Sequence, residues 1–193
     1  MRIGREASSD MGRMAPLTRE ALDAEQRRVY DAVVAGPRRE MNGPVPFWLK
    51  SPGLADAAQR LGAWLRFESQ LPPSVRELAI LVTARAMTAQ VEWHLHRPIA
   101  EQAGLSPHVI GAIAARTPPD LASDDEALTY AIAERLTKTH ALDDELYARG
   151  LLRFGERGMV ELVALVGYYT LVALTLNAFE ATLPDGAGPP LDP

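Results

Sequence analysis

The 193-residue sequence predicts an all-α protein, a bundle of about eight helices. Residues that begin and end helices recur along the whole chain, and they divide it into segments of helical length. No segment shows the alternation of apolar and polar residues that is typical of strands. Asn-Gly, the strongest short hairpin signal, occurs once, at Asn42-Gly43, and lies inside a proline-rich loop. The length suits a single domain.

The first two helices have clear boundaries. Thr18 is the expected cap of the first helix, and Gly36-Pro37 ends it. Ser51-Pro52 gives the second helix a cap followed by a proline at its first helical position. Pro72-Pro73 ends this helix.

Capping boxes predict the starts of two further helices. Ser74 with Glu77 opens a helix that is apolar on nearly every side, and Ser123 with Glu126 opens a later one. Between them, Gly104 ends one helix and Ser106-Pro107 starts the next.

The last part of the domain is expected to form two helices that meet at Gly155. Asp143 caps the first of them, and the second begins at about Glu156. Residues 162–179 are uncharged and approach the length of a membrane span. They include several polar residues and have no basic flank, so we expect a core helix buried on all sides.

Composition excludes several classes of function. The chain has no cysteine, which removes disulfides, thiolate nucleophiles and thiolate metal sites. Its 20 basic and 25 acidic residues give a net charge of −5, which argues against a nucleic-acid partner. No targeting segment or membrane span is expected, so the protein is predicted to be cytoplasmic.

Three parts are expected along the chain. Residues 1–14 carry charges throughout and are predicted to be a disordered lead. Residues 15–183 form the single domain, and residues 184–193 form an irregular tail rich in proline and glycine. The loop 37–50 carries Phe47 and Trp48, which either cover a pocket or pin the loop to the core, and pinning is the default.

The segment Glu92-Trp93-His94-Leu95-His96 contains the residues with most chemical potential. On a helix Glu92 and His96 share a face, while His94 points elsewhere. Two ligands are too few for a zinc site, so no metal is expected. Pro98 should kink the helix and open it around His96. From composition alone, a surface Glu–His pair is the favoured explanation of this pattern.

Two residues of the preceding apolar helix have both a structural and a functional interpretation. Glu77 fits the third position of a capping box, which would explain it fully. Arg85 lies two turns from Glu77 on the same face and would pair with a structural carboxylate or bind substrate. No function is assigned to His108 or His140.

These residues resemble a known family. Arg76-Glu77-Leu78, followed by Glu92-Trp93-x-x-His96 and Ala103-Gly104-Leu105-Ser106, is similar to the carboxymuconolactone decarboxylase and alkylhydroperoxidase D-like (AhpD-like) family. The resemblance runs from about Leu17 to Phe179. It implies an AhpD-like helical bundle that assembles as a homo-oligomer, a trimer or hexamer, with the site near subunit contacts.

The resemblance also separates two branches of this family. The hydroperoxidase branch needs two cysteines, which would fall on Ala89 and Glu92 here, so thiol peroxidase chemistry is excluded. The decarboxylase branch carries the E-W-x-x-H pattern and works without metal or organic cofactor on a carboxylated lactone.

The resemblance implies a pocket that contains Glu77, Glu92 and His96. In the enzyme that it implies, His96 is the general acid/base, Glu92 orients it or shares its proton, and Glu77 is a second carboxylate. The expected substrate-binding residues are Arg85, Trp93, Trp48 and Phe47. The expected substrate is a small carboxylated lactone or related cyclic acid of aromatic catabolism. The alternative is a non-catalytic AhpD-like oligomer that binds a small ligand or a partner protein.

Overall fold

A computed structural model describes residues 12–15, 17–183 and 187–193 of the chain. Within these residues it contains eight α-helices and no strand, which confirms the predicted all-α class. The helices are α1 (Ala24–Ala35), α2 (Val45–Trp48), α3 (Pro52–Phe67), α4 (Pro73–Ala86), α5 (Gln90–Gln102), α6 (Pro107–Ala114), α7 (Asp124–Thr139) and α8 (Asp144–Ala178).

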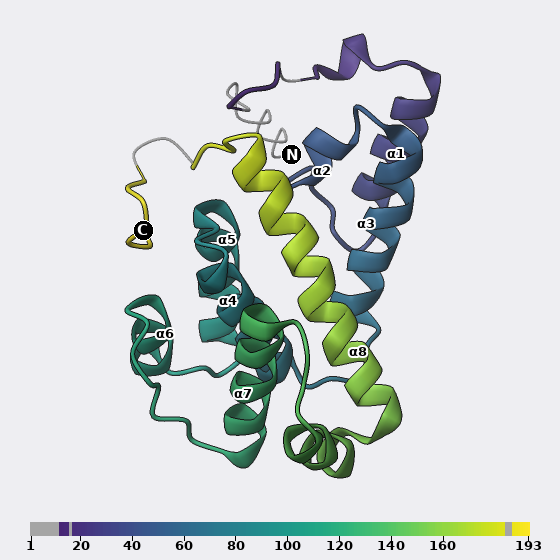
Figure 1. The fold of residues 1–193 in the computed structure, drawn as a ribbon. Helices are drawn as coiled ribbons and strands as arrows, with labels where there is room; N and C mark the ends of the chain where they lie inside the picture. The colour runs from purple at the N-terminus through teal and green to yellow at the C-terminus, as the bar shows by residue number, and fades with distance from the viewer. Residues whose placement is uncertain (1–11, 16, 184–186) are drawn as a thin grey trace.

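The long helix α8 holds the two halves of the bundle together (Figure 1). Helices α1 and α3 pack against each other on one side of it, and α4, α5, α6 and α7 lie on the other. Helix α4 packs on α5, α7 and α8, and its residues 77–85 are almost all buried. The polar side chains of α4 therefore need partners inside the protein.

Three of the predicted caps are confirmed. The side chains of Ser106, Ser123 and Asp143 each accept a hydrogen bond from the backbone three residues later, at the starts of α6, α7 and α8. Gly155 has φ 68° and ψ 175° and interrupts the helical geometry of α8. The structure thus confirms the predicted meeting of two helices at this residue, and the range of α8 includes both of them.

Two predicted helix starts are wrong. Thr18 precedes only a short 3-10 turn, Arg19–Ala21, and α1 begins after Asp23, whose side chain forms a capping box with Gln26. Helix α4 begins at Pro73, so Ser74 lies inside its first turn and makes no cap. Proline at the first position already suits a helix start, because its fixed φ is helical and its missing N–H is not needed there. Glu77 therefore has no capping role.

The loop 37–50 contains the short helix α2, which the sequence analysis missed. Its two aromatic residues are buried: the ring of Phe47 stacks on Phe179, and Trp48 Nε1 donates to Thr175 Oγ1 over 3.0 Å. Trp48 also meets the ring of Tyr168 edge-on. Both aromatics thus pin the loop to α8, as the default interpretation expected.

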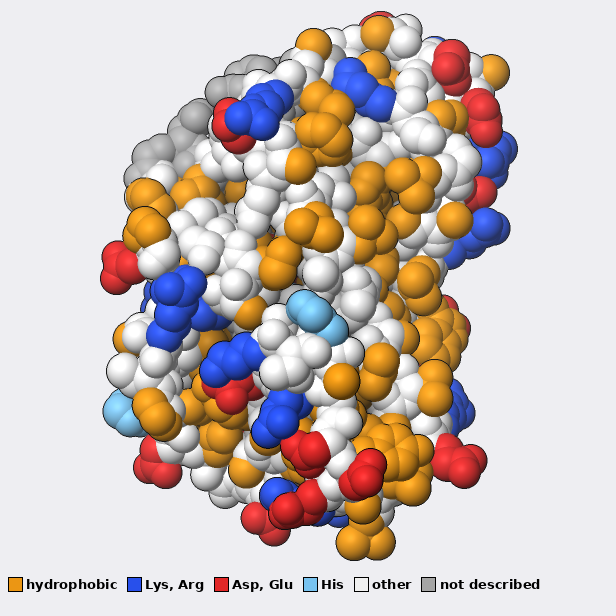
Figure 2. Space-filling model, viewed as in Figure 1, with side chains coloured by type: hydrophobic (Ala, Val, Ile, Leu, Met, Phe, Trp, Pro, Cys, Tyr) orange, Lys and Arg blue, Asp and Glu red, His pale blue; other side chains and the backbone are white. Residues whose placement is uncertain are grey.

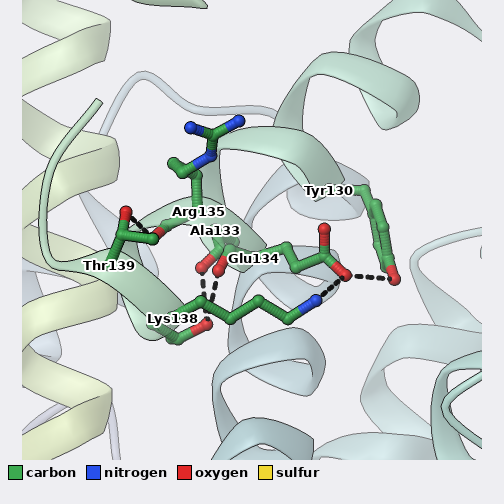
Figure 3. Close-up of polar contacts among 7 residues, drawn as sticks. Tyr130, Ala133, Glu134, Arg135, Lys138 and Thr139 are labelled. Carbon is green, nitrogen blue, oxygen red and sulfur yellow. Dashed lines mark hydrogen bonds and ion pairs between the residues drawn. The ribbon is translucent and has the colours of Figure 1, made fainter. Parts of the chain in front are cut away.

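The exposed side of α7 carries a chain of contacts between side chains four residues apart (Figure 3). Tyr130 and Lys138 both reach the Glu134 carboxylate, at 3.1 and 2.9 Å. Such pairs stabilise a helix by a few tenths of a kcal/mol each. These contacts explain the polar side chains on this face of α7 by helix stability alone.

The described ends of the chain lie against the bundle. Residues 12–14 belong to the expected lead, and the Arg13 backbone donates to the carbonyl oxygen of Phe179. The rest of that lead, residues 1–11, lies outside the described residues. In the expected tail, the backbone of Leu191 exchanges two hydrogen bonds with the Gln90 side chain. Residues 184–186 lie outside the described residues.

Helix α8 is long and apolar enough to cross a membrane by length and composition. In its most apolar part 61% is buried inside the protein, as is typical of a core helix. An uncharged stripe of the helix nevertheless remains exposed. It comprises Val160, Val163, Gly167, Leu171 and Leu174. Figure 2 shows the molecule from the side that α8 crosses, with hydrophobic side chains over the middle and right of this face and charged side chains both at its rim and in its lower half.

We expect a second copy of the chain to cover this apolar stripe of α8, since large exposed apolar patches mark interaction sites. Light scattering at micromolar concentration should show a mass that is a multiple of the 21.0 kDa monomer. Leu174→Glu should shift the protein toward monomer. Leu152→Glu is the control, because Leu152 is 90% exposed and lies outside the stripe. A wild-type monomer would contradict the assembly.

Candidate functional site

A pocket of about 80 Å³ lies between α5, α8 and the loop before α2. On this measure of volume a water molecule needs roughly 10–15 Å³, so the pocket has room for several waters or one small molecule. It is lined by Arg38, Asn42, Gly43, Pro44, Arg66, Glu92, Leu95, His96, Ile99, Tyr168, Tyr169, Val172 and Leu176.

The turn between α4 and α5 brings Glu77 and His96 together. Thr88 has φ 47° there, and the backbone of Ala89 bonds back to Ala84, so the chain reverses direction tightly. Helix α5 returns along α4, and it continues through Pro98 to Gln102. This places His96 Nδ1 2.7 Å from Glu77 Oε2.

His96 is held on three sides. Its side chain is only 7% exposed, and Nε2 lies 3.5 Å from Glu92 Oε1. The ring of Tyr169 meets the imidazole edge-on, with 5.1 Å between ring centroids. Since an imidazole N–H donates to a carboxylate, the Glu77 contact keeps the proton on Nδ1 and leaves Nε2 on the side of Glu92.

Glu92 is buried and carries a strongly shifted pKa. Burial raises the pKa of its carboxyl group from 4.5 to about 8, and the charge of Glu77 adds to this rise. Arg66 and Arg38 act in the opposite direction. Glu92 is therefore mostly a neutral acid at neutral pH. Its Oε2 atom is buried and has no hydrogen-bond partner among the described residues.

Two arginines that the sequence analysis did not identify line the pocket. Arg38 Nη2 donates to the hydroxyl of Tyr168 over 3.0 Å, and Arg66 stands over the ring of Phe67. Among the described residues neither guanidinium lies within ion-pair distance of a carboxylate. Burial raises the pKa of the Tyr168 hydroxyl, and Arg38 opposes that rise.

A signal for Arg66 is present in the sequence. Arg66 lies four residues after Gly62 and seven after Gln59, both buried, so it is in phase with the buried side of α3. Arg38 lies in an irregular loop, where no periodicity indicates the direction of a side chain.

Glycine at position 62 leaves the space in which Arg38 and Tyr168 meet. A Cβ atom at this position would overlap both the Tyr168 hydroxyl and Arg38 Nη2. Because α3 approaches α8 this closely, Gly62 is part of what shapes the pocket wall.

The structure brings together three of the residues that the sequence analysis singled out and places four elsewhere. Glu77, Glu92 and His96 converge, and Glu77 lies behind His96 and does not line the pocket. The side chains of Trp93, Trp48 and Phe47 are buried in the core and do not line the pocket either.

Arg85, a predicted substrate-binding residue, also lies away from the pocket. Its Nε donates to the carbonyl oxygen of Ala114 over 2.7 Å and so caps the end of α6. Arg85 lies two turns of α4 away from Glu77 on the same face. At this distance its side chain contacts α6 and not the pocket. Among the described residues, no group of three His, Cys, Asp or Glu side chains is placed to hold a metal ion.

The shifted pKa of Glu92 predicts how stability depends on pH. Between about pH 4.5 and 8 the folded protein holds a proton on Glu92 that the unfolded chain has released, so the free energy of unfolding falls as pH rises. The whole effect is on the order of a few kcal/mol. Glu92→Gln carries a neutral amide at every pH, so its melting temperature should fall less between about pH 5 and pH 8.

Calorimetry of wild type and variant at both pH values measures this difference. Glu101→Gln, an exposed change on the same helix, is the control and should keep the wild-type pH dependence. An equal pH dependence in wild type and Glu92→Gln would mean that Glu92 is ionised in the folded protein.

Comparison with known proteins agrees with the fold and the motif. Residues 52–135, from the start of α3 into α7, match the model of the carboxymuconolactone decarboxylase family. No curated protein matches the sequence.

Several solved structures share the fold. One is the alkylhydroperoxidase AhpD core of a peroxidase-related protein from Ralstonia eutropha JMP134, with a TM-score of 0.73 at 16% identity over 91% of this chain and 94% of that one. Another is the debrominase Bmp8, with a TM-score of 0.67 at 16% identity over 88% and 91%. A third is ATU0492 from Agrobacterium tumefaciens, with a TM-score of 0.60 at 15% identity over 74% and 99%.

At these identities the solved structures establish the fold alone, while the family model matches the segment that carries Glu77, Glu92 and His96. The chain therefore has the AhpD-like fold, and its residues 52–135 are similar to the carboxymuconolactone decarboxylase family.

Proposed function

We propose that this protein is a cofactor-free enzyme of the decarboxylase-like branch. It acts by proton transfer on a small carboxylated lactone or related cyclic acid of aromatic catabolism, and we take it to work in the cytoplasm. The observation that carries the proposal is the placement of His96 between two carboxyl groups, Glu77 and Glu92, at the wall of a pocket.

In this mechanism Glu77 is a positioning residue. Its carboxylate accepts from Nδ1 of His96 and fixes the ring, so Nε2 remains available on the pocket side. The same contact stabilises the imidazolium that forms when Nε2 takes a proton. His96 is thus prepared to remove a proton from a substrate or return one.

Glu92 supplies the proton for the second half of the reaction. Loss of CO₂ from a carboxylated lactone leaves an enolate-like carbanion, which must be protonated at carbon. With a pKa of about 8 the carboxyl group holds a proton at neutral pH, and it lines the pocket next to Nε2 of His96. A buried acid near the operating pH is suited to donate that proton.

Two observations support this function over the non-catalytic alternative. Glu77 and Glu92 lie within contact distance of His96 in the protein interior. Burying titratable groups costs stability, and a protein that only binds a ligand has no need of this cost. A fold neighbour, Bmp8, is an enzyme, a debrominase, and its cysteine-to-alanine variant was solved in complex with 2,3,4-tribromopyrrole, a small ring compound. Release of CO₂ from lactones of aromatic catabolism tests the proposal directly.

We expect His96→Gln to lower turnover by roughly 100- to 10,000-fold, the usual contribution of a general acid/base. Glutamine is polar and a good helix former, so the protein should fold, as circular dichroism can verify. His94→Gln and His108→Gln are the matched controls and should keep activity near wild type, since neither residue lines the pocket. Full activity in His96→Gln would refute the mechanism.

The protein should not reduce alkyl hydroperoxides at the expense of a dithiol. The chain has no cysteine, so it has no thiolate to attack the peroxide. An assay with an alkyl hydroperoxide and a thioredoxin-type donor should show no turnover above that of denatured protein. Turnover by the metal-free protein would place it in the other branch of the family.

A further inference from the structure

We propose that Arg38 and Arg66 form the recognition site for the single carboxylate of a small acid with an otherwise apolar ring. This inference builds on the proposed function and narrows its substrate class. It concerns binding, which is measurable without turnover.

The two guanidinium groups line the same pocket. Both act on the carboxyl group of Glu92 and on the hydroxyl of Tyr168. Each therefore lies near the same two groups on α5 and α8. A ligand carboxylate placed there would meet both cations.

Arg38 and Arg66 differ from most other arginines in the described part of the chain, which form ion pairs with carboxylates. Ion pairs to carboxylates occupy Arg28, Arg60, Arg97, Arg135 and Arg153. Within the described part of the chain, Arg38 has only the Tyr168 hydroxyl as a hydrogen-bond partner, and its Nε is buried without one. A partly buried cation with unused donors is suited to a carboxylate, which accepts two parallel N–H bonds.

The charge of the pocket also favours an anion. Glu92 is mostly neutral at neutral pH, and Glu77 is occupied by His96. The two arginines are therefore not neutralised by the pocket itself. An anion bound beside them would in turn favour the neutral form of Glu92, the form that donates a proton.

The rest of the lining limits the ligand to one carboxylate. Four aliphatic side chains line the pocket: Leu95, Ile99, Val172 and Leu176. Among the described residues no lysine, and no arginine besides Arg38 and Arg66, lines it. A second carboxylate among them would lose its hydration without gaining a partner, which costs several kcal/mol in general. The volume of about 80 Å³ restricts the ligand to a small molecule.

Isothermal titration calorimetry with three ring compounds tests the site. Cyclohexanecarboxylate carries one charge on an apolar ring, cyclohexanecarboxamide is its neutral counterpart, and trans-cyclohexane-1,4-dicarboxylate adds a second charge. We expect the monocarboxylate to bind roughly 10- to 100-fold more tightly than the amide, the range for charge-assisted hydrogen bonds. It should also bind more tightly than the dicarboxylate.

The variants Arg66→Gln and Arg38→Gln should each weaken the monocarboxylate by roughly tenfold or more and leave amide binding unchanged. Arg38→Gln also changes the contact with the Tyr168 hydroxyl. Arg38→Lys keeps the positive charge and therefore separates the effect of the charge from the effect of this contact. Arg60→Gln on α3 is the control, because Arg60 is exposed and pairs with Asp56. It should bind like the wild type.

The outcomes separate recognition from reaction. His96→Gln should keep monocarboxylate binding while it loses turnover. Absence of the proposed reaction would therefore not contradict the arginine site. Equal binding of acid and amide, no binding of the acid to wild type, or unchanged binding in the arginine variants would overturn the site. Tighter binding of the dicarboxylate would overturn the single-carboxylate class.

Discussion

The hydrogen bond between Glu77 Oε2 and His96 Nδ1, 2.7 Å long, is the contact on which the site depends. Two carboxyl groups and an imidazole lie in the interior, each 7% exposed or less, and a buried charge is tolerated only when it is paired. Glu77 meets this condition through His96. Glu92 meets it in another way, because burial raises its pKa to about 8 and keeps it neutral. The two carboxyl groups thus lie in different environments beside one histidine.

The fold supports this arrangement from three directions. The tight turn at Thr88 aligns α4 with α5 and fixes the distance between Glu77 and His96. Helix α8 contributes Tyr169, which packs edge-on against the imidazole. Gly62 lets α3 approach α8 closely enough for Arg38 to reach Tyr168. The site therefore combines side chains from distant parts of the chain.

Local chemistry made much of the fold predictable from the sequence, because caps such as Ser106 and Asp143 act within a few residues. Ser74 was misassigned because the proline before it already starts α4. The motif identified Glu92 and His96, whereas the partner of Glu77 depends on how α4 and α5 pack. Arg85 was assigned to the pocket on helical phase alone, and phase does not indicate which neighbour a long side chain reaches. Arg38 lies in a loop without periodicity, so only the tertiary structure places it.

Infrared spectroscopy of the Glu92 carboxyl group can show whether Glu92 holds a proton in the folded protein. The difference between spectra of wild type and Glu92→Gln isolates this one group in the resting protein. At about pH 7 we expect the C=O band of a protonated carboxylic acid, which should disappear as pH rises past the pKa of about 8. A difference spectrum with only carboxylate bands at about pH 6 to 7 would contradict this expectation, because Glu92 would then have no proton to donate.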